Sequence, residues 1–105
     1  MFTQFTSIVQ SLISLTDNEM KILCDSFEFR KVPAQTLLLD GGEISEEVYF
    51  INKGSIQSTN SMFTANQFAG IFDSFIQHAP STQQLATIED CELLVISSEK
   101  LMRLY

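Results

Sequence analysis

Short apolar runs separated by glycine or asparagine turns recur from Phe27 to Ile96, and they constrain the fold more than any other feature. The turn Asp40-Gly41-Gly42-Glu43 follows one run, and Asn52-Lys53-Gly54 follows the next. Glycine reaches positive φ at little steric cost, so both sequences are typical of tight turns. The expected strands lie near Phe29 and at Thr36–Leu39, Glu47–Ile51, Ser55–Thr59, Gln84–Ile88 and Glu92–Ile96. Strands of about five residues at this spacing predict an all-β sandwich, jelly roll or barrel.

Two short helices are expected before the first strand. Apolar residues recur at helical spacing within Thr6–Phe27. Thr16-Asp17-Asn18-Glu19 matches a capping box, in which the Thr16 hydroxyl accepts from the Glu19 amide and the Glu19 side chain accepts from the Thr16 amide. The sequence therefore predicts a break near Ser14–Thr16 and a second helix that starts just after it.

Two later segments are less regular. Phe63–Ile76 is ambiguous, although apolar residues at helical spacing favour a short helix over residues 70–77. Ser58-Thr59-Asn60-Ser61 indicates the tip of a shortened hairpin. Near the C-terminus, Ser97 or Ser98 is expected to cap a final helix over Glu99–Tyr105.

Length and charge narrow the class of protein. The 105 residues predict a single domain over residues 1–105. Thirteen acidic and six basic residues give a net charge of −7, and the basic residues are not clustered. Nucleic-acid binding depends on clustered Lys and Arg, so we expect no direct contact with DNA or RNA.

The N-terminus and the cysteines predict a cytoplasmic protein. Met1–Gln10 has no basic region followed by a long apolar run, so it does not resemble a secretory signal. No apolar run approaches the ~20 residues that span a bilayer. We therefore expect Cys24 and Cys91 to stay reduced and to behave as small apolar side chains.

Two stretches resemble one family. Residues Thr36–Gly54 read TLLLDGGEISEEVYFINKG, and residues Pro80–Leu101 read PSTQQLATIEDCELLVISSEKL. Their order and spacing resemble the cyclic-nucleotide-binding domain of Crp/Fnr-type bacterial transcription regulators. The resemblance implies a mainly β fold with flanking α: a double-stranded β-helix, or jelly-roll-like β-roll, with two N-terminal helices and a short C-terminal helix. It also implies a regulatory sensor or effector domain in transcription regulation.

The resemblance also locates a ligand cassette, in which this chain departs from the family. In the family a Glu receives the ribose hydroxyl and an Arg pairs with the cyclic phosphate. The Arg position, directly after Pro80, holds Ser81, and the Glu falls near Phe72 with Asp73 beside it. No Arg lies between Lys53 and Arg103, and no Lys lies between Lys53 and Lys100. A buried phosphate needs a cation, so we expect a degenerate cassette that does not bind cyclic AMP. Its candidate residues are Gly70, Ile71, Phe72, Asp73, Ser81 and Thr82.

Large apolar residues replace the missing polar anchors, and two interpretations stay open. They form an apolar pocket for an unidentified small molecule, or they fill the roll and leave an interaction module without a ligand. These residues are Phe63, Phe68, Ile71, Phe72 and Phe75. A true cyclic nucleotide sensor is the third alternative.

The sequence offers little for catalysis. His78 is the only His and has no nucleophile motif beside it, and Glu43, Glu46 and Glu47 are expected to be a solvated acidic rim. We expect no enzyme activity, no metal and no cofactor. Self-association or a partner protein is expected, because Leu101, Met102, Leu104 and Tyr105 are apolar. The sequence ends just inside the family's long helix, so we expect it to lack the family's DNA-binding part.

Overall fold

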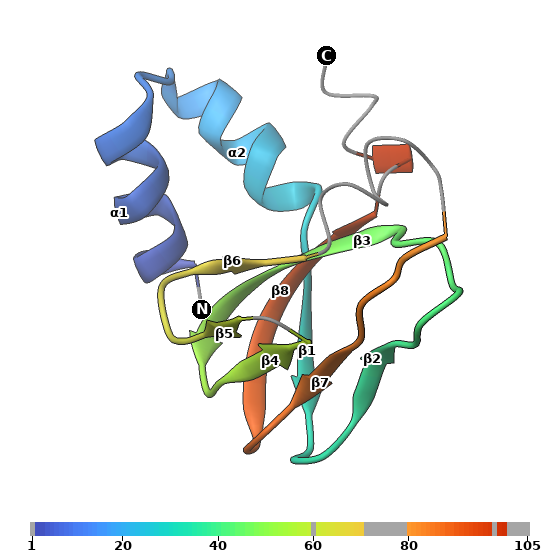
Figure 1. Cartoon of the computed structure of the whole chain (residues 1–105). Helices are drawn as coiled ribbons and strands as arrows, with labels where there is room; N and C mark the ends of the chain where they lie inside the picture. The colour runs from blue at the N-terminus through green and yellow to red at the C-terminus, as the bar shows by residue number, and fades with distance from the viewer. Residues whose placement is uncertain (1, 60, 71–79, 98, 101–105) are drawn as a thin grey trace.

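The chain folds into two antiparallel sheets and an N-terminal pair of helices (Figure 1). The computed structural model describes residues 2–59, 61–70, 80–97 and 99–100. The helices are α1 (Thr3–Leu12) and α2 (Asp17–Asp25). The strands are β1 (Glu28–Val32), β2 (Leu37–Leu39), β3 (Glu47–Lys53), β4 (Ile56–Ser58), β5 (Met62–Phe63), β6 (Phe68–Ala69), β7 (Leu85–Thr87) and β8 (Cys91–Ser97).

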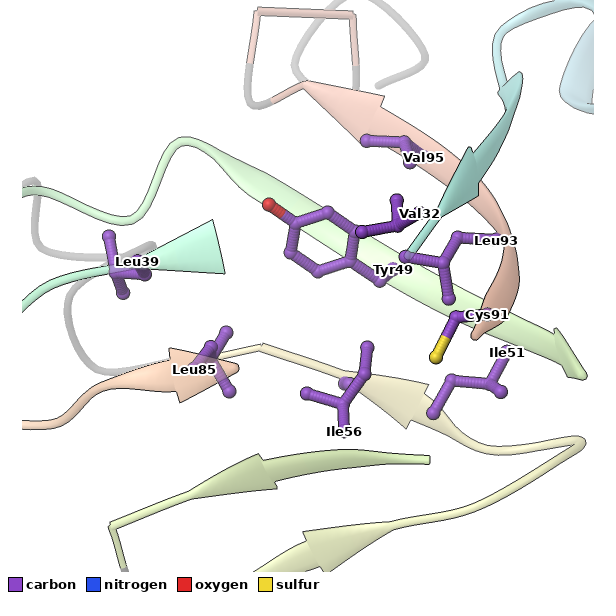
Figure 2. Close-up of a cluster of buried hydrophobic side chains, with 10 residues drawn as sticks. Val32, Leu39, Tyr49, Ile51, Ile56, Leu85, Cys91, Leu93 and Val95 are labelled. Atoms are coloured by element: carbon purple, nitrogen blue, oxygen red, sulfur yellow. The ribbon is translucent and has the colours of Figure 1, made fainter. Parts of the chain in front are cut away.

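The two sheets enclose a shared apolar core. One sheet has the strand order β1-β8-β3-β6, and the other has the order β2-β7-β4-β5. Side chains alternate between the faces of a strand, so every second residue points inward. Figure 2 shows these inward side chains converging from both sheets. The buried cluster comprises Val32, Leu39, Tyr49, Ile51, Ile56, Ala69, Leu85, Cys91, Leu93 and Val95.

The helices cover the outer face of the first sheet. Phe5 and Val9 of α1 form a second buried cluster with Phe50 of β3 and Leu94 of β8. The Phe5 and Phe50 rings meet edge to face with centroids 5.4 Å apart, a favoured geometry for aromatic pairs. In Figure 1 both helices lie on the side of β6 and β8, away from β2 and β7. The residues at the interior of β3 and β8 are therefore buried on both faces.

The predicted helix break and capping box are confirmed. The Glu19 amide donates to the Thr16 hydroxyl at 3.1 Å, and the Thr16 amide donates to the Glu19 carboxylate at 3.0 Å. The capping interactions lower the pKa of Glu19. The helical region extends over Thr3–Asp25, with its break between Leu12 and Asp17, rather than over Thr6–Phe27. Phe27 instead packs against Phe5.

The strand predictions are confirmed in place, with shorter or longer ends. The hairpin of β4 and β5 is short, as expected, and pairs Ile56 with Phe63 and Gln57 with Met62. Strand β6, which pairs with Tyr49 and Phe50 of β3, was not predicted inside the ambiguous segment. The helix predicted over residues 70–77 falls, apart from Gly70, outside the described residues.

Only the start of the predicted C-terminal helix lies within the described residues. The Ser97 hydroxyl accepts from the Lys100 amide at 3.3 Å, which is the geometry of a helix cap. Residues 101–105 lie outside the described part, so the final helix and the double-stranded β-helix pattern stay predictions. Within the described residues, no helix has the length and apolar character needed to cross a bilayer.

Gly54 is the turn glycine that the packing requires. Its φ is +107°, and a Cβ built there would lie 2.5 Å from the Cys91 sulfur and 2.8 Å from the Asp90 carbonyl oxygen. Gly41 has ordinary φ, and a Cβ there would meet nothing within 4 Å. Only the first position therefore excludes a side chain.

We expect Gly54→Ala to lower the free energy of unfolding by about 2–4 kcal/mol, since it combines backbone strain with a clash against a buried strand. Gly41→Ala is the matched control and should change stability by less than about 1 kcal/mol. Urea denaturation followed by circular dichroism measures both. Equal losses in the two variants would contradict this account of the turn.

Candidate functional site

A cavity of about 270 Å³ opens at the end of the roll where several strands begin or finish. It lies between the end of β2, the loop that enters β3, the start of β7 and the end of β8. The described residues that line it are Leu38, Leu39, Glu43, Ile44, Ser45, Glu46, Glu47, Tyr49, Leu85 and Ser97. We call this opening the roll mouth. All of these lining residues belong to the two stretches that carry the family resemblance.

Apolar side chains close the floor of the roll mouth. Tyr49 is 4% exposed, and its ring lies between the sheets with Leu39 and Leu85 on the side of the mouth (Figure 2). Leu85 is fully buried and Leu39 is 7% exposed. Below this level the other seven side chains of the buried cluster pack between the sheets. The described interior therefore supports the filled-roll interpretation over a deep pocket.

Arg30, Glu47 and Tyr49 form a polar network on the inner face of the first sheet. The Tyr49 hydroxyl donates to the Glu47 carboxylate at 3.0 Å, and Arg30 donates to both oxygens of that carboxylate at 3.4 and 3.3 Å. Arg30 also donates to Glu28 at 3.2 Å. Burial raises the pKa of the Tyr49 hydroxyl, and the nearby charge of Glu47 raises it further. Tyr49 is therefore held neutral as a hydrogen-bond donor.

The sequence interpretation missed this network. It gave Arg30 no role and placed Glu47 in a solvated acidic rim. Arg30 shares its strand face with Val32. Because β1 and β3 flank the same strand β8, where Arg30 pairs with Leu93 and Glu47 with Ser97, the two side chains meet across the inner face of β8. The alternation of Glu28, Arg30 and Val32 in the sequence was the available signal.

Ser81, at the family's Arg position, is 4% exposed and its polar groups are used locally. Its hydroxyl donates to the Gln83 carbonyl at 2.9 Å and accepts from the Gln83 amide at 3.0 Å. Its backbone amide donates to the Glu43 carbonyl, and its carbonyl accepts from the Gly42 amide, both at 2.7 Å. Ser81 therefore holds two loops together and carries no cation for a phosphate.

The other predicted cassette residues are only partly brought together. Thr82 is exposed in the turn with Ser81, whereas Gly70 is buried directly after β6. No hydrogen bond between described residues joins Gly70 to Ser81 or Thr82. Ile71, Phe72 and Asp73 lie outside the described residues.

Side-chain hydrogen bonds add to the contact between the two loops. The Gln84 amide nitrogen donates to the Asp40 carboxylate at 2.8 Å, and the same oxygen accepts from the Gly41 amide. The Asp40 backbone amide donates to the Glu43 carboxylate at 2.7 Å. An isolated bridge between Ile44 and Pro80 continues the pairing. We call residues 40–44 and 80–84 together the loop clasp.

The charges at the roll mouth do not suit an anion. Its lining includes Glu43, Glu46 and Glu47. The nearby cation Arg30 pairs with Glu47, but it is shared with a second carboxylate, that of Glu28. No group of three or more His, Cys, Asp or Glu residues arranged to hold a metal occurs in the described part of the chain. Burial raises the pKa of the Cys24 and Cys91 thiols, which disfavours the reactive thiolate form.

Comparison with known proteins establishes the fold. The sequence matches no family model and no curated protein. The structure is similar to that of the catabolite activator protein of Thermus thermophilus, with a TM-score of 0.73 and 17% identity over 87% of this chain and 47% of that one. It is also similar to CLP, the c-di-GMP-responsive global regulator of Xanthomonas campestris, with a TM-score of 0.68 and 22% identity over 85% of this chain and 48% of that one.

A third similar structure is cAMP-bound PfPKA-R, with a TM-score of 0.73 and 14% identity over 86% of this chain and 35% of that one. The chain thus spans less than half the length of each of these structures. At this level of identity the likeness establishes the fold, which is that of a cyclic-nucleotide-binding-like domain, as the sequence resemblance predicted.

The Tyr49 network predicts a specific pH dependence. Because the pKa of Tyr49 is raised in the folded state, the unfolded chain loses this proton first, at about pH 10. The stability that the neutral hydroxyl contributes is therefore complete below about pH 10 and is lost as the pH rises beyond it. Tyr49→Phe should cost about 1 kcal/mol at neutral pH, where the hydrogen bond to Glu47 is lost.

Urea denaturation of both proteins between neutral pH and about pH 11 tests this. We expect the gap in unfolding free energy between wild type and Tyr49→Phe to shrink once the pH exceeds about 10. Other titrating groups are common to the two proteins, so their effects cancel in the difference. A gap that stays constant over this range would show that Tyr49 ionises equally in both states.

Proposed function

We propose that residues 1–105 form a regulatory domain of the cyclic-nucleotide-binding-like type whose roll does not hold a cyclic nucleotide. The observation that carries this proposal is the content of the roll: apolar side chains fill it, and its mouth is acidic. Fold alone does not fix a ligand, so the argument depends on the chemistry of these residues.

Electrostatics supports the proposal first. A phosphate group removed from water requires a fixed cation or several aligned donors. The family supplies an Arg directly after the cassette proline, and this chain has Ser81 there, with its hydroxyl bound to Gln83. Arg30 is engaged by Glu28 and Glu47, so a phosphate would compete with two carboxylates for it.

Space supports it second. Tyr49, Leu39 and Leu85 close the floor of the roll mouth, and the cavity above them is about 270 Å³. Ligand sites commonly span about 300–1,000 Å³ and bury most of the ligand. A nucleotide would therefore have to displace the buried Tyr49 ring or stand largely in solvent.

We therefore favour a domain that binds another protein over a domain that senses a small molecule. The two similar bacterial proteins are described as a catabolite activator and a global regulator, and a Crp/Fnr-type role in transcription regulation is the corresponding proposal for this chain. A partner that binds one arrangement of the helices more tightly than another would shift their population, which transmits a signal without any ligand in the roll. We also propose that the domain has no enzyme activity.

A true cyclic nucleotide sensor is the competing function, because one similar structure is described as cAMP-bound and another as c-di-GMP-responsive. Titration calorimetry with cyclic AMP, cyclic GMP and cyclic di-GMP separates the two. We expect no binding heat and no rise in melting temperature at about 1 mM of each nucleotide. A ligand present at 100 times its Kd would instead stabilise the fold by about 2.7 kcal/mol.

Glu47→Gln is the matched variant for this titration. It removes one negative charge from the roll mouth and releases Arg30 from one of its two carboxylates. Weak binding that appears only in this variant would agree with the proposed electrostatic block. Micromolar affinity of the wild-type protein for any of the three nucleotides would overturn the proposed function.

A further inference from the structure

The surface where α1 meets α2 is apolar and exposed. Leu12, Ile13 and Ile22 are 71%, 54% and 50% exposed. Helix α1 places two residues in the buried cluster beneath it, whereas no residue of α2 is buried. Figure 1 shows the turn between the two helices at the end of the helical layer that points away from the sheets. We call the surface formed by residues 12–25 the helix corner.

A hollow of about 280 Å³ lies within the helix corner. Its described lining is apolar except for one carboxylate: Ile13, Leu15, Glu19, Ile22 and Leu23. Hydrogen bonds fix the hollow from both sides. The Ile13 amide donates to the Val9 carbonyl at 2.9 Å, which continues the last turn of α1, and the capping box of Thr16 and Glu19 fixes the start of α2. A partner therefore meets a preformed surface, which lowers the entropic cost of binding.

Acidic residues flank the apolar part of the helix corner. Glu19 and Asp25 lie three residues before and three residues after Ile22, which places both beside it on the surface of α2. Helix α1 has no charged residue, whereas α2 has three acidic residues and one basic residue.

The position of Asp25 does not favour the helix that contains it. Asp25 is the last residue of α2, where the helix dipole opposes a negative charge, and the last turn has no basic residue. The exposed Ile22 side chain beside it is also unfavourable in water. Local features that oppose stability are expected where a surface serves a function, so we looked for a partner that would compensate both.

We propose that the helix corner binds a basic amphipathic helix of another protein. This inference rests on the proposed function, and it adds the surface and the chemistry of the partner. The hollow is lined by two helices and their connecting turn, so it offers no strand edge with which a partner backbone could pair. An occupant has to satisfy its own backbone groups, as an α-helix does, and contribute apolar side chains to the hollow.

Charge determines which helix suits this surface. Lysine or arginine at the margins of a partner helix would be attracted to Glu19 and Asp25 and to a chain with a net charge of −7. A second copy of this chain has the same net charge and would bring the same carboxylates together. The helix corner therefore favours a basic partner over self-association.

A synthetic helical peptide of about 18 residues, with leucine along one face and lysine along the margins of that face, is the probe. A second peptide with glutamate in place of every lysine is its control. Fluorescence anisotropy of each labelled peptide measures its affinity for the full chain. We expect the lysine peptide to bind and the glutamate peptide to show no binding, because Glu19 and Asp25 repel it.

Ile22→Gln and Leu37→Gln form a matched pair for this measurement. The two side chains are 50% and 51% exposed, but Leu37 lies on β2 in the other sheet. Ile22→Gln should weaken binding of the lysine peptide about tenfold, because an apolar contact in the hollow is lost. Leu37→Gln should leave the affinity unchanged.

Asp25→Asn separates binding from stability. It should weaken binding of the lysine peptide about twofold to threefold, since one attractive charge is removed. Urea denaturation should show the same or a higher free energy of unfolding, since the unfavourable interaction with the dipole of α2 is relieved. A variant that loses stability but keeps its affinity would show that Asp25 has only a structural role, and this would contradict the proposal.

The results distinguish failure of this inference from failure of the proposed function. A wild-type chain that does not bind the lysine peptide at protein concentrations up to about 1 mM overturns the inference, while the absence of nucleotide binding would still support the proposed function. Equal losses in Ile22→Gln and Leu37→Gln also overturn it, as does equal binding of both peptides. Sedimentation equilibrium that shows a wild-type dimer, lost in Ile22→Gln, would assign the helix corner to a second copy instead.

Discussion

Strand β8 is the element on which the rest of the structure depends, because it is paired on both edges and buried on both faces. It lies between β1 and β3 and pairs with both in antiparallel register, with one register shift in β3 between Ile51 and Lys53. Leu93 and Val95 point into the roll, whereas Leu94 and Ile96 point toward the helical side. Burial of one such side chain contributes about 1.5–3 kcal/mol, and four lie within one strand. Strand β8 therefore contributes side chains both to the buried cluster inside the roll and to the one beneath the helices.

The β2-β7-β4-β5 sheet is stabilised more by polar contacts between loops than by buried strands. Its strands have two or three residues, so apolar burial contributes less and polar contacts between loops contribute more. The Thr87 hydroxyl accepts from the Thr36 amide and donates to the Pro33 carbonyl, which fixes the turn before β2. At the other end the loop clasp joins Gly42 and Glu43 to Ser81. These hydrogen bonds close both ends of the second sheet with groups of the chain itself.

Sequence reasoning succeeded where the cause of a structure is local and failed where it is a contact between distant strands. The capping box, the turn at Gly54 and the main strand positions follow from neighbouring residues. Strand β6 is two residues long and exists because it pairs with β3, which no local pattern reveals. The position of Arg30 beside Glu47 depends on both of their strands pairing with β8. Only two ends of the proposed cassette, Gly70 and Ser81-Thr82, are described, so its central residues stay predictions.

The polar network of Arg30, Glu47 and Tyr49 sets the cost of binding a guest that uses these groups. A guest that bound Arg30 would have to compete with two carboxylates, and one that bound the Tyr49 hydroxyl would have to compete with Glu47. A buried partner left unsatisfied by that exchange costs about 1–3 kcal/mol before the guest gains anything. On the outer face of the β2-β7-β4-β5 sheet, by contrast, Leu37 and Met62 are already 51% and 56% exposed. The contacts that Arg30, Glu47 and Tyr49 make with one another are therefore the physical basis of the function proposed above.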